Sequence, residues 1–210
     1  MRKADRDRKP SRQTPFRDPR QRIVIVCEGR TEKDYIDGFV KNLRARTVST
    51  LNVQVIGQAG VPMTVVENAK QIRQAASEQA SRENDDNLSI DSVWAVFDVD
   101  DHPNVENAKI MATDNGVRCA VSNACFELWL YLHFQDNPGI QHRGQLLKLV
   151  KAIIPSYDKR PDFKTFSNGL AAAVSRAEKM DIMADEDGES GRNPSTGIWK
   201  LIQAIQKCCE

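Results

Sequence analysis

The sequence predicts an α/β fold: a mainly parallel sheet of about four strands, flanked by helices and followed by a C-terminal helical extension. The first observation behind this is that short apolar runs rich in β-branched residues alternate with longer segments of helical periodicity. The second is that only helical patterns follow after about residue 141. Strands that alternate with helices are typical of parallel sheets with right-handed crossovers.

The expected strands are short apolar runs that suit burial on both faces of a sheet. They cover about residues 23–27, 51–55, 93–97 and 117–121. The helices expected after them have apolar residues at intervals of three and four. They cover about residues 31–46, 62–82, 105–114 and 126–134. Thr31 is expected to cap the first helix, Pro62 suits the first turn of the second, and Gly116 suits the end of the third.

The extension is expected to hold three more helices, at about residues 144–154, 167–180 and 195–208. Residues 193–196, with the sequence Asn-Pro-Ser-Thr, are expected to form a turn and the cap of the last helix. The acidic stretch 181–189 is expected to be a solvated loop.

Charge divides the chain into an arm and a body. Residues 1–22 carry nine Lys or Arg against three Asp, a net charge of +6, whereas the whole chain is only +1. The arm contains prolines and no apolar periodicity, so it is expected to be disordered. One interpretation is that the arm binds polyphosphate, because Lys and Arg side chains near a nucleic acid release its condensed counterions. The other is that the arm is a solubilising tail. The expected organisation is this arm, an α/β core over residues 23–140, and the helical extension over residues 141–210 packed on the core.

Composition disfavours several protein classes. The arm lacks the apolar stretch of a secretory signal, and no run approaches the roughly 20 apolar residues that a membrane span needs. The five cysteines form no C-x-x-C pair, and three of them stand in apolar runs, as buried reduced thiols do. A cytoplasmic location without a membrane partner is therefore expected. The three histidines are scattered without zinc-binding spacing, so zinc is not expected.

Acidic residues follow two of the expected strands. Glu28 comes directly after the first strand, and Asp98 and Asp100 follow the third. In an open parallel sheet, ligands bind at the carboxyl ends of the strands, so neighbouring strands would bring these carboxylates together. Clustered carboxylates repel one another unless a cation neutralises them, and oxygen ligands favour Mg²⁺ or Mn²⁺. Gly29 permits the tight turn that presents Glu28, while Glu32 either faces the same site or stabilises the N-terminus of the helix.

Two segments resemble the Toprim fold, a Rossmann-like fold shared by topoisomerases, bacterial primases and OLD-type nucleases. They are I-V-C-E-G-R-T-E at 25–32 and W-A-V-F-D-V-D-D at 94–101. Three more segments resemble the RloB-like family of bacterial defence-associated proteins, and the first of them is the most specific. They are S-N-A-C-F-E-L-W-L-Y-L-H-F at 122–134, Tyr157-Asp158-Lys159, and N-P-S-T at 193–196. The resemblance thus covers most of the chain after the arm.

This resemblance implies a domain that binds a divalent metal and cuts nucleic acid. Position by position, Glu28 matches the acidic residue after the first Toprim strand, and Asp98 and Asp100 match the metal-binding pair. Glu32 matches a second acidic residue that OLD-type relatives use in the first motif.

OLD-type relatives also use a late lysine, and this chain has two candidates for it. Lys159 is the first, as a catalytic cation, and Lys164 is a rival that would contact substrate. Asp101 and His102 follow the D-x-D pair directly, and the resemblance assigns neither of them a role.

Three further residues are candidates for metal or substrate. Glu127 stands among apolar residues, where an ionised carboxylate is costly unless it is paired or binds metal. It either joins the metal site or stabilises a helix N-terminus. Asn123 either binds substrate or serves as a cap or loop residue, and Arg30 either contacts a phosphate or is an exposed loop arginine. His133 and Trp129 are expected to belong to the core.

These residues predict a metal-dependent nuclease that hydrolyses DNA or RNA in an anti-phage, abortive-infection defence system. Asp98 and Asp100 would hold Mg²⁺ or Mn²⁺, and Glu28 would bind metal or take the proton of the attacking water. The main alternative is a non-catalytic or partner-activated subunit of a complex with an ATPase, because the chain has no G-x-x-x-x-G-K-[ST] loop of its own. A receiver-like phosphoacceptor is a weaker alternative, because three helices follow the point where such a domain ends. The sequence leaves open whether the chain forms a homo-oligomer.

Overall fold

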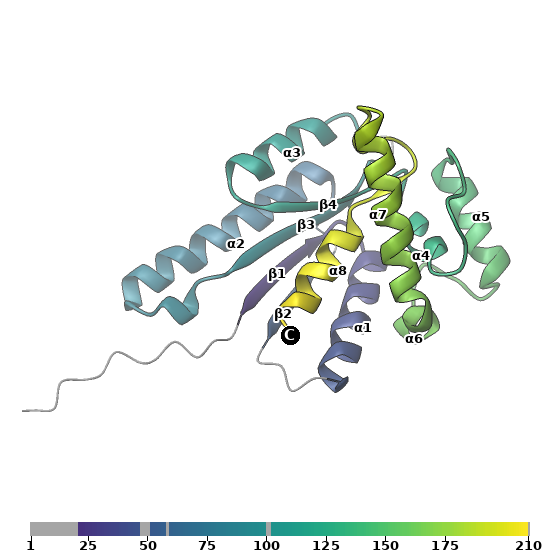
Figure 1. The fold of residues 1–210 in the computed structure, drawn as a ribbon. Helices are drawn as coiled ribbons and strands as arrows, with labels where there is room; N and C mark the ends of the chain where they lie inside the picture. Colours follow the sequence, from purple (N-terminus) through teal and green to yellow (C-terminus); the bar gives the residue numbers. More distant parts are fainter. Residues whose placement is uncertain (1–20, 47–50, 58, 100–101, 210) are drawn as a thin grey trace, which may run out of the picture.

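The computed structural model describes residues 21–46, 51–57, 59–99 and 102–209. It has a five-stranded sheet in the order β2-β1-β3-β4-β5 (Figure 1). The strands are β1 (Arg22–Cys27), β2 (Asn52–Ile56), β3 (Ser92–Asp98), β4 (Arg118–Asn123) and β5 (Ser195–Thr196). The first four pair in parallel and β5 pairs antiparallel with β4. The predicted α/β class with a mainly parallel, Rossmann-like sheet is confirmed.

Helices cover both faces of this sheet (Figure 1). One face carries α2 (Pro62–Glu83) and α3 (Val105–Asp114). The other face carries α1 (Arg30–Arg46), α4 (Glu127–Leu132) and α8 (Ile198–Lys207). The remaining helices share the core on this side and pack mainly against α1, α4 and α8. They are α5 (Arg143–Ile153), α6 (Phe163–Phe166) and α7 (Leu170–Glu186). Short 3-10 turns lie at Asp86–Leu88 and Ser167–Gly169. No helix within the described ranges has both the length and the apolar character needed to cross a membrane.

Strand β1 shows why an uninterrupted apolar run belongs in the middle of the sheet. Ile23, Ile25 and Cys27 point into the core under α1, whereas Val24 and Val26 point into the core under α2. Side chains alternate between the faces of a strand, so a strand covered on both sides must be apolar at every position. β1 lies between β2 and β3, with the register Ile25 opposite Val55 and Trp94.

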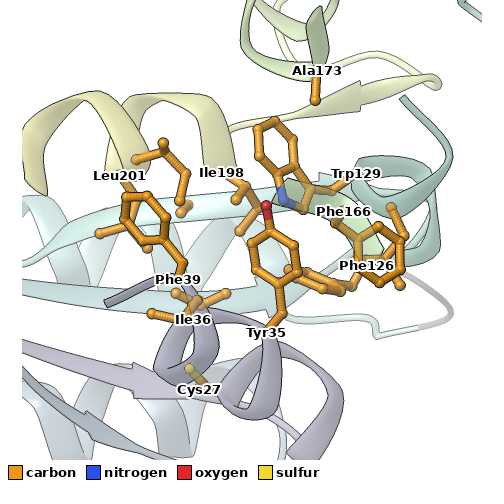
Figure 2. Packing of buried hydrophobic residues seen from close by; sticks show 14 of the residues in the cluster. Cys27, Tyr35, Ile36, Phe39, Phe126, Trp129, Phe166, Ala173, Ile198 and Leu201 are labelled. Carbon is orange, nitrogen blue, oxygen red and sulfur yellow. The ribbon is translucent and has the colours of Figure 1, made fainter. Parts of the chain in front are cut away.

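The larger core joins the sheet to the helical extension. Figure 2 shows Tyr35 of α1 standing among Phe126, Trp129 and Phe166. The Tyr35 ring meets each of them edge to face, with centroids 5.6, 6.2 and 5.9 Å away. Edge-to-face geometry is the favoured arrangement of aromatic pairs at these separations. Because Phe166 lies on α6, the extension shares its core with the first helix of the α/β part.

Two expectations for the extension are wrong. The stretch 181–189 is not a loop throughout, because α7 continues to Glu186 and Asp181 is buried. The Asp181 carboxylate accepts a hydrogen bond from the Trp199 indole and pairs with Lys200, each at 2.9 Å, so its charge is balanced inside the fold. The last helix begins at Ile198, because Ser195 and Thr196 pair with β4 instead of capping it.

The expected basic arm lies almost wholly outside the described residues. Only Gln21 and Arg22 of the arm are described, and Arg22 already belongs to β1, opposite Asn52. Its backbone N–H donates to the Asp91 carboxylate at 2.7 Å, and its guanidinium donates to the Leu88 carbonyl at 2.7 Å. The strand therefore begins one residue earlier than expected.

Candidate functional site

The carboxyl ends of β1 and β3 lie side by side, and they bring Glu28 and Asp98 together. The Glu28 N–H donates to the Val96 carbonyl at 2.9 Å, which extends the parallel ladder by one residue beyond β1. The Asp98 N–H then donates to Glu28 Oε2 at 3.1 Å. The two acidic residues predicted to meet at this edge are therefore in contact. Asp100, the third, lies outside the described residues.

Glu32 folds back from the first turn of α1 over the same edge. Its Oε2 accepts the Gly29 N–H at 3.0 Å, and the residue is only 7% exposed. A Cβ at Gly29 would stand 2.8 Å from Glu32 Oε2, closer than side chains approach. A side chain at position 29 would therefore displace the Glu32 carboxylate from its place over this turn. Thr31 does not serve as the expected cap, since α1 begins at Arg30.

Glu127 is the first residue of α4, which follows β4, the strand that pairs with β3. The residue is only 5% exposed. Two neutral donors contact its carboxylate. The Tyr157 hydroxyl donates to Glu127 Oε1 at 3.3 Å, and the Cys125 thiol also donates to it. Burial raises the pKa of the Cys125 thiol, and the charge of Glu127 raises it further, so this cysteine is a thiol rather than a thiolate.

These four side chains, Glu28, Glu32, Asp98 and Glu127, form what we call the acid cluster. Burial raises the pKa of Asp98 well above its ordinary value, and the charges of Glu32, Glu28 and Glu127 raise it further. The pKa of Glu32 is raised in the same way, by burial first and then by Glu28 and Glu127. Mutual pKa elevation of this kind is the mark of carboxylates that share a site.

The charge of the acid cluster is poorly compensated. Among the described ion pairs, the basic group that contacts the cluster is His102, whose Nε2 lies 3.2 Å from Glu28 Oε1. Across the described segments, no lysine or arginine forms an ion pair with any of the four carboxylates. Asp98 Oδ1 is buried and has no hydrogen-bond partner among the described atoms. A buried carboxylate oxygen without a donor or a cation is costly, so a bound cation would stabilise this group.

The acid cluster supplies the oxygen ligands that a hard divalent cation prefers, but its described side chains do not surround an ion. Its oxygens are the donors that Mg²⁺ and Mn²⁺ prefer. No group of three or more His, Cys, Asp and Glu side chains within the described ranges is arranged to hold a metal ion by itself. Mg²⁺ is commonly held by one or two carboxylates together with water and substrate phosphates, and Glu28 with Asp98 fits this mode.

Of the cations predicted for the site, Lys159 lies beside the first turn of α1. Its carbonyl accepts the Thr31 hydroxyl of α1 at 3.0 Å, and its backbone is left-handed with φ 67°. The next residue, Arg160, forms an ion pair with Asp34 of α1. The Lys159 side chain is exposed and so is free to reach toward a ligand. Within the described contacts, its ammonium has no ion pair.

The other predicted substrate contacts are, like Lys159, without a described contact to the acid cluster. Lys164 is exposed on α6, where its backbone N–H donates to the Asp162 carboxylate at 3.1 Å. Arg30 is exposed at the first position of α1. Asn123 ends β4, and its side-chain amide donates to the Gly191 carbonyl at 3.0 Å, which is a loop-fixing role. No described contact joins Lys164, Arg30 or Asn123 to the acid cluster.

Sequence reasoning missed two residues at this edge. Tyr157 was noted only as part of a resembling segment, and His102 was given no role. Each contacts a carboxylate distant in the chain, Tyr157 to Glu127 and His102 to Glu28. No periodicity marks such contacts. The charge cost of burying Glu127 was a signal that some donor must reach it.

Comparison with known proteins gives one match. The family model described as RloB-like protein matches residues 23–205, from the start of β1 to near the end of α8. No curated protein and no solved structure matches the chain.

Proposed function

The chain belongs to the RloB-like family, and from this premise we propose that it hydrolyses phosphodiester bonds of DNA or RNA at the acid cluster, with Mg²⁺ or Mn²⁺. The observation that carries the proposal is the buried Oδ1 of Asp98, which has no hydrogen-bond partner within the described residues and lies near Glu28, Glu32 and Glu127. Carboxylates that raise one another's pKa favour either a proton or a cation, and hard oxygen donors favour a divalent one.

Asp98 and Glu28 would hold the cation, with Asp100 as the further ligand expected from the sequence. When bound, the ion would polarise the scissile phosphate and neutralise charge that develops on its oxygens. Glu28 would bind metal or accept the proton of the attacking water. The Asp98 N–H on Oε2 and His102 beside Oε1 fix the orientation of its carboxylate for either task.

Lys159 would place a positive charge on the substrate side of this edge. Its carbonyl is tied to Thr31 while its ammonium is exposed, so the backbone is fixed and the side chain can extend. A lysine in this position would bind a phosphate as a point charge. Such a contact helps most if it strengthens as charge develops in the transition state.

A second candidate function is a partner-activated subunit of a bacterial anti-phage defence complex that contains an ATPase. The observation that favours it is that the sequence has no G-x-x-x-x-G-K-[ST] loop, so any ATP-driven step needs a partner. Binding of such a partner would then switch the enzyme on. Because the sequence lacks this loop for binding a nucleoside triphosphate, ATP hydrolysis would be carried out by the partner.

The test is cleavage of plasmid DNA, single-stranded DNA and total RNA by the full chain with Mg²⁺ or Mn²⁺. We expect Asp98→Asn to lower the rate by about 100-fold or more, because it removes a charge from the ion's ligand set. Asp114→Asn, at the exposed end of α3, is the matched control and should leave the rate unchanged. Cleavage that persists in Asp98→Asn would refute the nuclease proposal. Activity only after a co-purified ATPase is added would favour the second candidate.

A further inference from the structure

A segment of the helical extension, residues 154–162, reaches the acid cluster from outside the α/β part of the chain. Tyr157 lies at its centre and is only 5% exposed. Its ring is buried in the larger core, whereas its hydroxyl points to the Glu127 carboxylate at 3.3 Å. The segment therefore contributes a hydrogen-bond donor to a carboxylate thirty positions earlier in the chain.

Two contacts, made by the residues that follow Tyr157 in the chain, hold this segment against α1. The Thr31 hydroxyl donates to the Lys159 carbonyl at 3.0 Å, and Arg160 pairs with Asp34. A non-glycine residue in the left-handed region costs free energy, so these contacts must hold Lys159 in that conformation. Tyr157 is thus fixed by its buried ring and by the segment that follows it.

The phenol of Tyr157 serves as a permanent donor. Burial raises its pKa, and the charge of Glu127 raises it further, so the hydroxyl is protonated and donates to Glu127. A hydroxyl that donates to one carboxylate oxygen fixes the rotation of that group and leaves the second oxygen for another partner. Glu127 lies at the edge of the acid cluster, because it opens α4 just after β4, the strand that pairs with β3 opposite Asp98.

We propose that Tyr157 is a positioning residue of the metal site, which holds the Glu127 carboxylate in the orientation that the divalent cation requires. This inference rests on the proposed function and makes the helical extension part of the site. Residues that orient a metal's ligands commonly change metal affinity by 10-fold to 100-fold when they are removed.

The chain supplies a matched pair of tyrosines for the test. Tyr157→Phe removes the hydroxyl and keeps the buried ring. Tyr131→Phe makes the same change on α4, in a half-buried residue whose hydroxyl has no hydrogen bond in the described part of the protein. Mn²⁺ binding to the full chain is measured by the electron paramagnetic resonance of free Mn²⁺, without any nucleic acid. We expect Tyr157→Phe to weaken Mn²⁺ binding by about 10-fold and Tyr131→Phe to leave it unchanged.

Glu127→Gln completes a double-mutant cycle that separates positioning from general loosening of the fold. If Tyr157 acts through Glu127, Tyr157→Phe should cost little further affinity in the Glu127→Gln background. An equal loss in both backgrounds would overturn the proposal, and so would Mn²⁺ binding by Tyr157→Phe within about 2-fold of wild type. Wild-type protein that binds no Mn²⁺, or Asp98→Asn that binds it like wild type, would instead refute the metal site itself.

Discussion

Two buried polar groups on the same face of the sheet are built from similar parts and have opposite electrostatics. In the first, the Tyr35 hydroxyl lies 2.8 Å from His133 Nε2, and His133 Nδ1 donates to the Trp129 carbonyl at 2.9 Å. In the second, the acid cluster, the Tyr157 hydroxyl donates to Glu127. Both place a tyrosine hydroxyl on a buried acceptor, and both contribute rings to the larger core.

The difference lies in charge. Burial lowers the pKa of His133 to about 4, so the imidazole is neutral and both of its nitrogens have partners. In the acid cluster, by contrast, Asp98 Oδ1 has no described partner, and its neighbours raise the pKa of Asp98. Satisfied polar contacts inside a protein specify its structure, whereas a buried carboxylate oxygen that lacks a partner and stands among other acids is costly unless a ligand balances it. The first group should therefore matter for stability and the second for function.

The largest expected effect is the loss of the His133 ring. His133→Ala should lower the free energy of unfolding by about 3 kcal/mol, since it opens a cavity and leaves the Tyr35 hydroxyl unpaired. The ring is 4% exposed and contacts Tyr35, Trp129 and Phe166 edge to face. Urea unfolding at pH 8 measures the loss. A loss below about 1 kcal/mol would mean that the fold does not depend on this polar pair.

Acid should destabilise the protein through the same histidine. The folded pKa of about 4 lies below the ordinary value of 6.5, so the unfolded chain binds more protons between these two pH values. The stabilisation by neutral His133 is complete above pH 6.5 and decreases as the pH falls toward 4, by about 3 kcal/mol in total. Comparison of wild type with His133→Gln from pH 7 to 4.5 isolates this contribution, because Asp98 and Glu32 titrate in both proteins. Parallel curves for the two proteins would contradict it.

In the acid cluster, by contrast, removal of a charge should raise the free energy of unfolding. A raised pKa means that folded Glu32 binds its proton more tightly than the unfolded chain does, so its favourable contribution is present at low pH and is lost as the pH rises. Glu32→Gln should therefore stabilise the protein at pH 8, without metal, by about 1–2 kcal/mol. Gln can still accept the Gly29 N–H that Glu32 accepts.

Thermal unfolding with and without Mn²⁺ checks that prediction. Glu186→Gln, exposed at the end of α7, is the control and should have little effect. Added Mn²⁺ should reduce the advantage of Glu32→Gln, because a bound cation removes the repulsion that the substitution relieves. Destabilisation by Glu32→Gln in the absence of metal would show that this carboxylate is a structural cap instead.

The sequence was sufficient to predict those features of the two groups that follow from the spacing of apolar residues. Apolar runs with β-branched residues predicted β1 and β3, and the rule for parallel sheets then predicted that Glu28 and Asp98 would meet at one edge. The place of His133 in the core followed from the apolar residues around it. These predictions depend on the spacing of apolar residues and on the direction of the strands, and short stretches of sequence are enough to indicate both.

Contacts between distant segments could not be predicted in this way. Tyr157 follows α5 in a stretch without periodicity, and only the packing of the extension brings its hydroxyl to Glu127. Likewise Asp181 looked solvated by composition, yet Trp199 and Lys200 of α8 bury and balance it. β5, with two residues, is too short for any alternation to be visible. In each case the deciding partner lies on another element.

The smallest expected effect on stability is also the most direct test of the comparison, because the same change is made in both groups. Tyr35→Phe should lower the free energy of unfolding by about 1 kcal/mol, since it removes one hydrogen bond to His133 and leaves the ring in place. Mn²⁺ affinity should stay unchanged in this variant, whereas Tyr157→Phe should alter it. Urea unfolding and Mn²⁺ titration of the two proteins side by side provide both readouts. If Tyr35→Phe weakened Mn²⁺ binding as strongly as Tyr157→Phe, the two groups would act as one network through α4, and the division between structural and functional burial would be wrong.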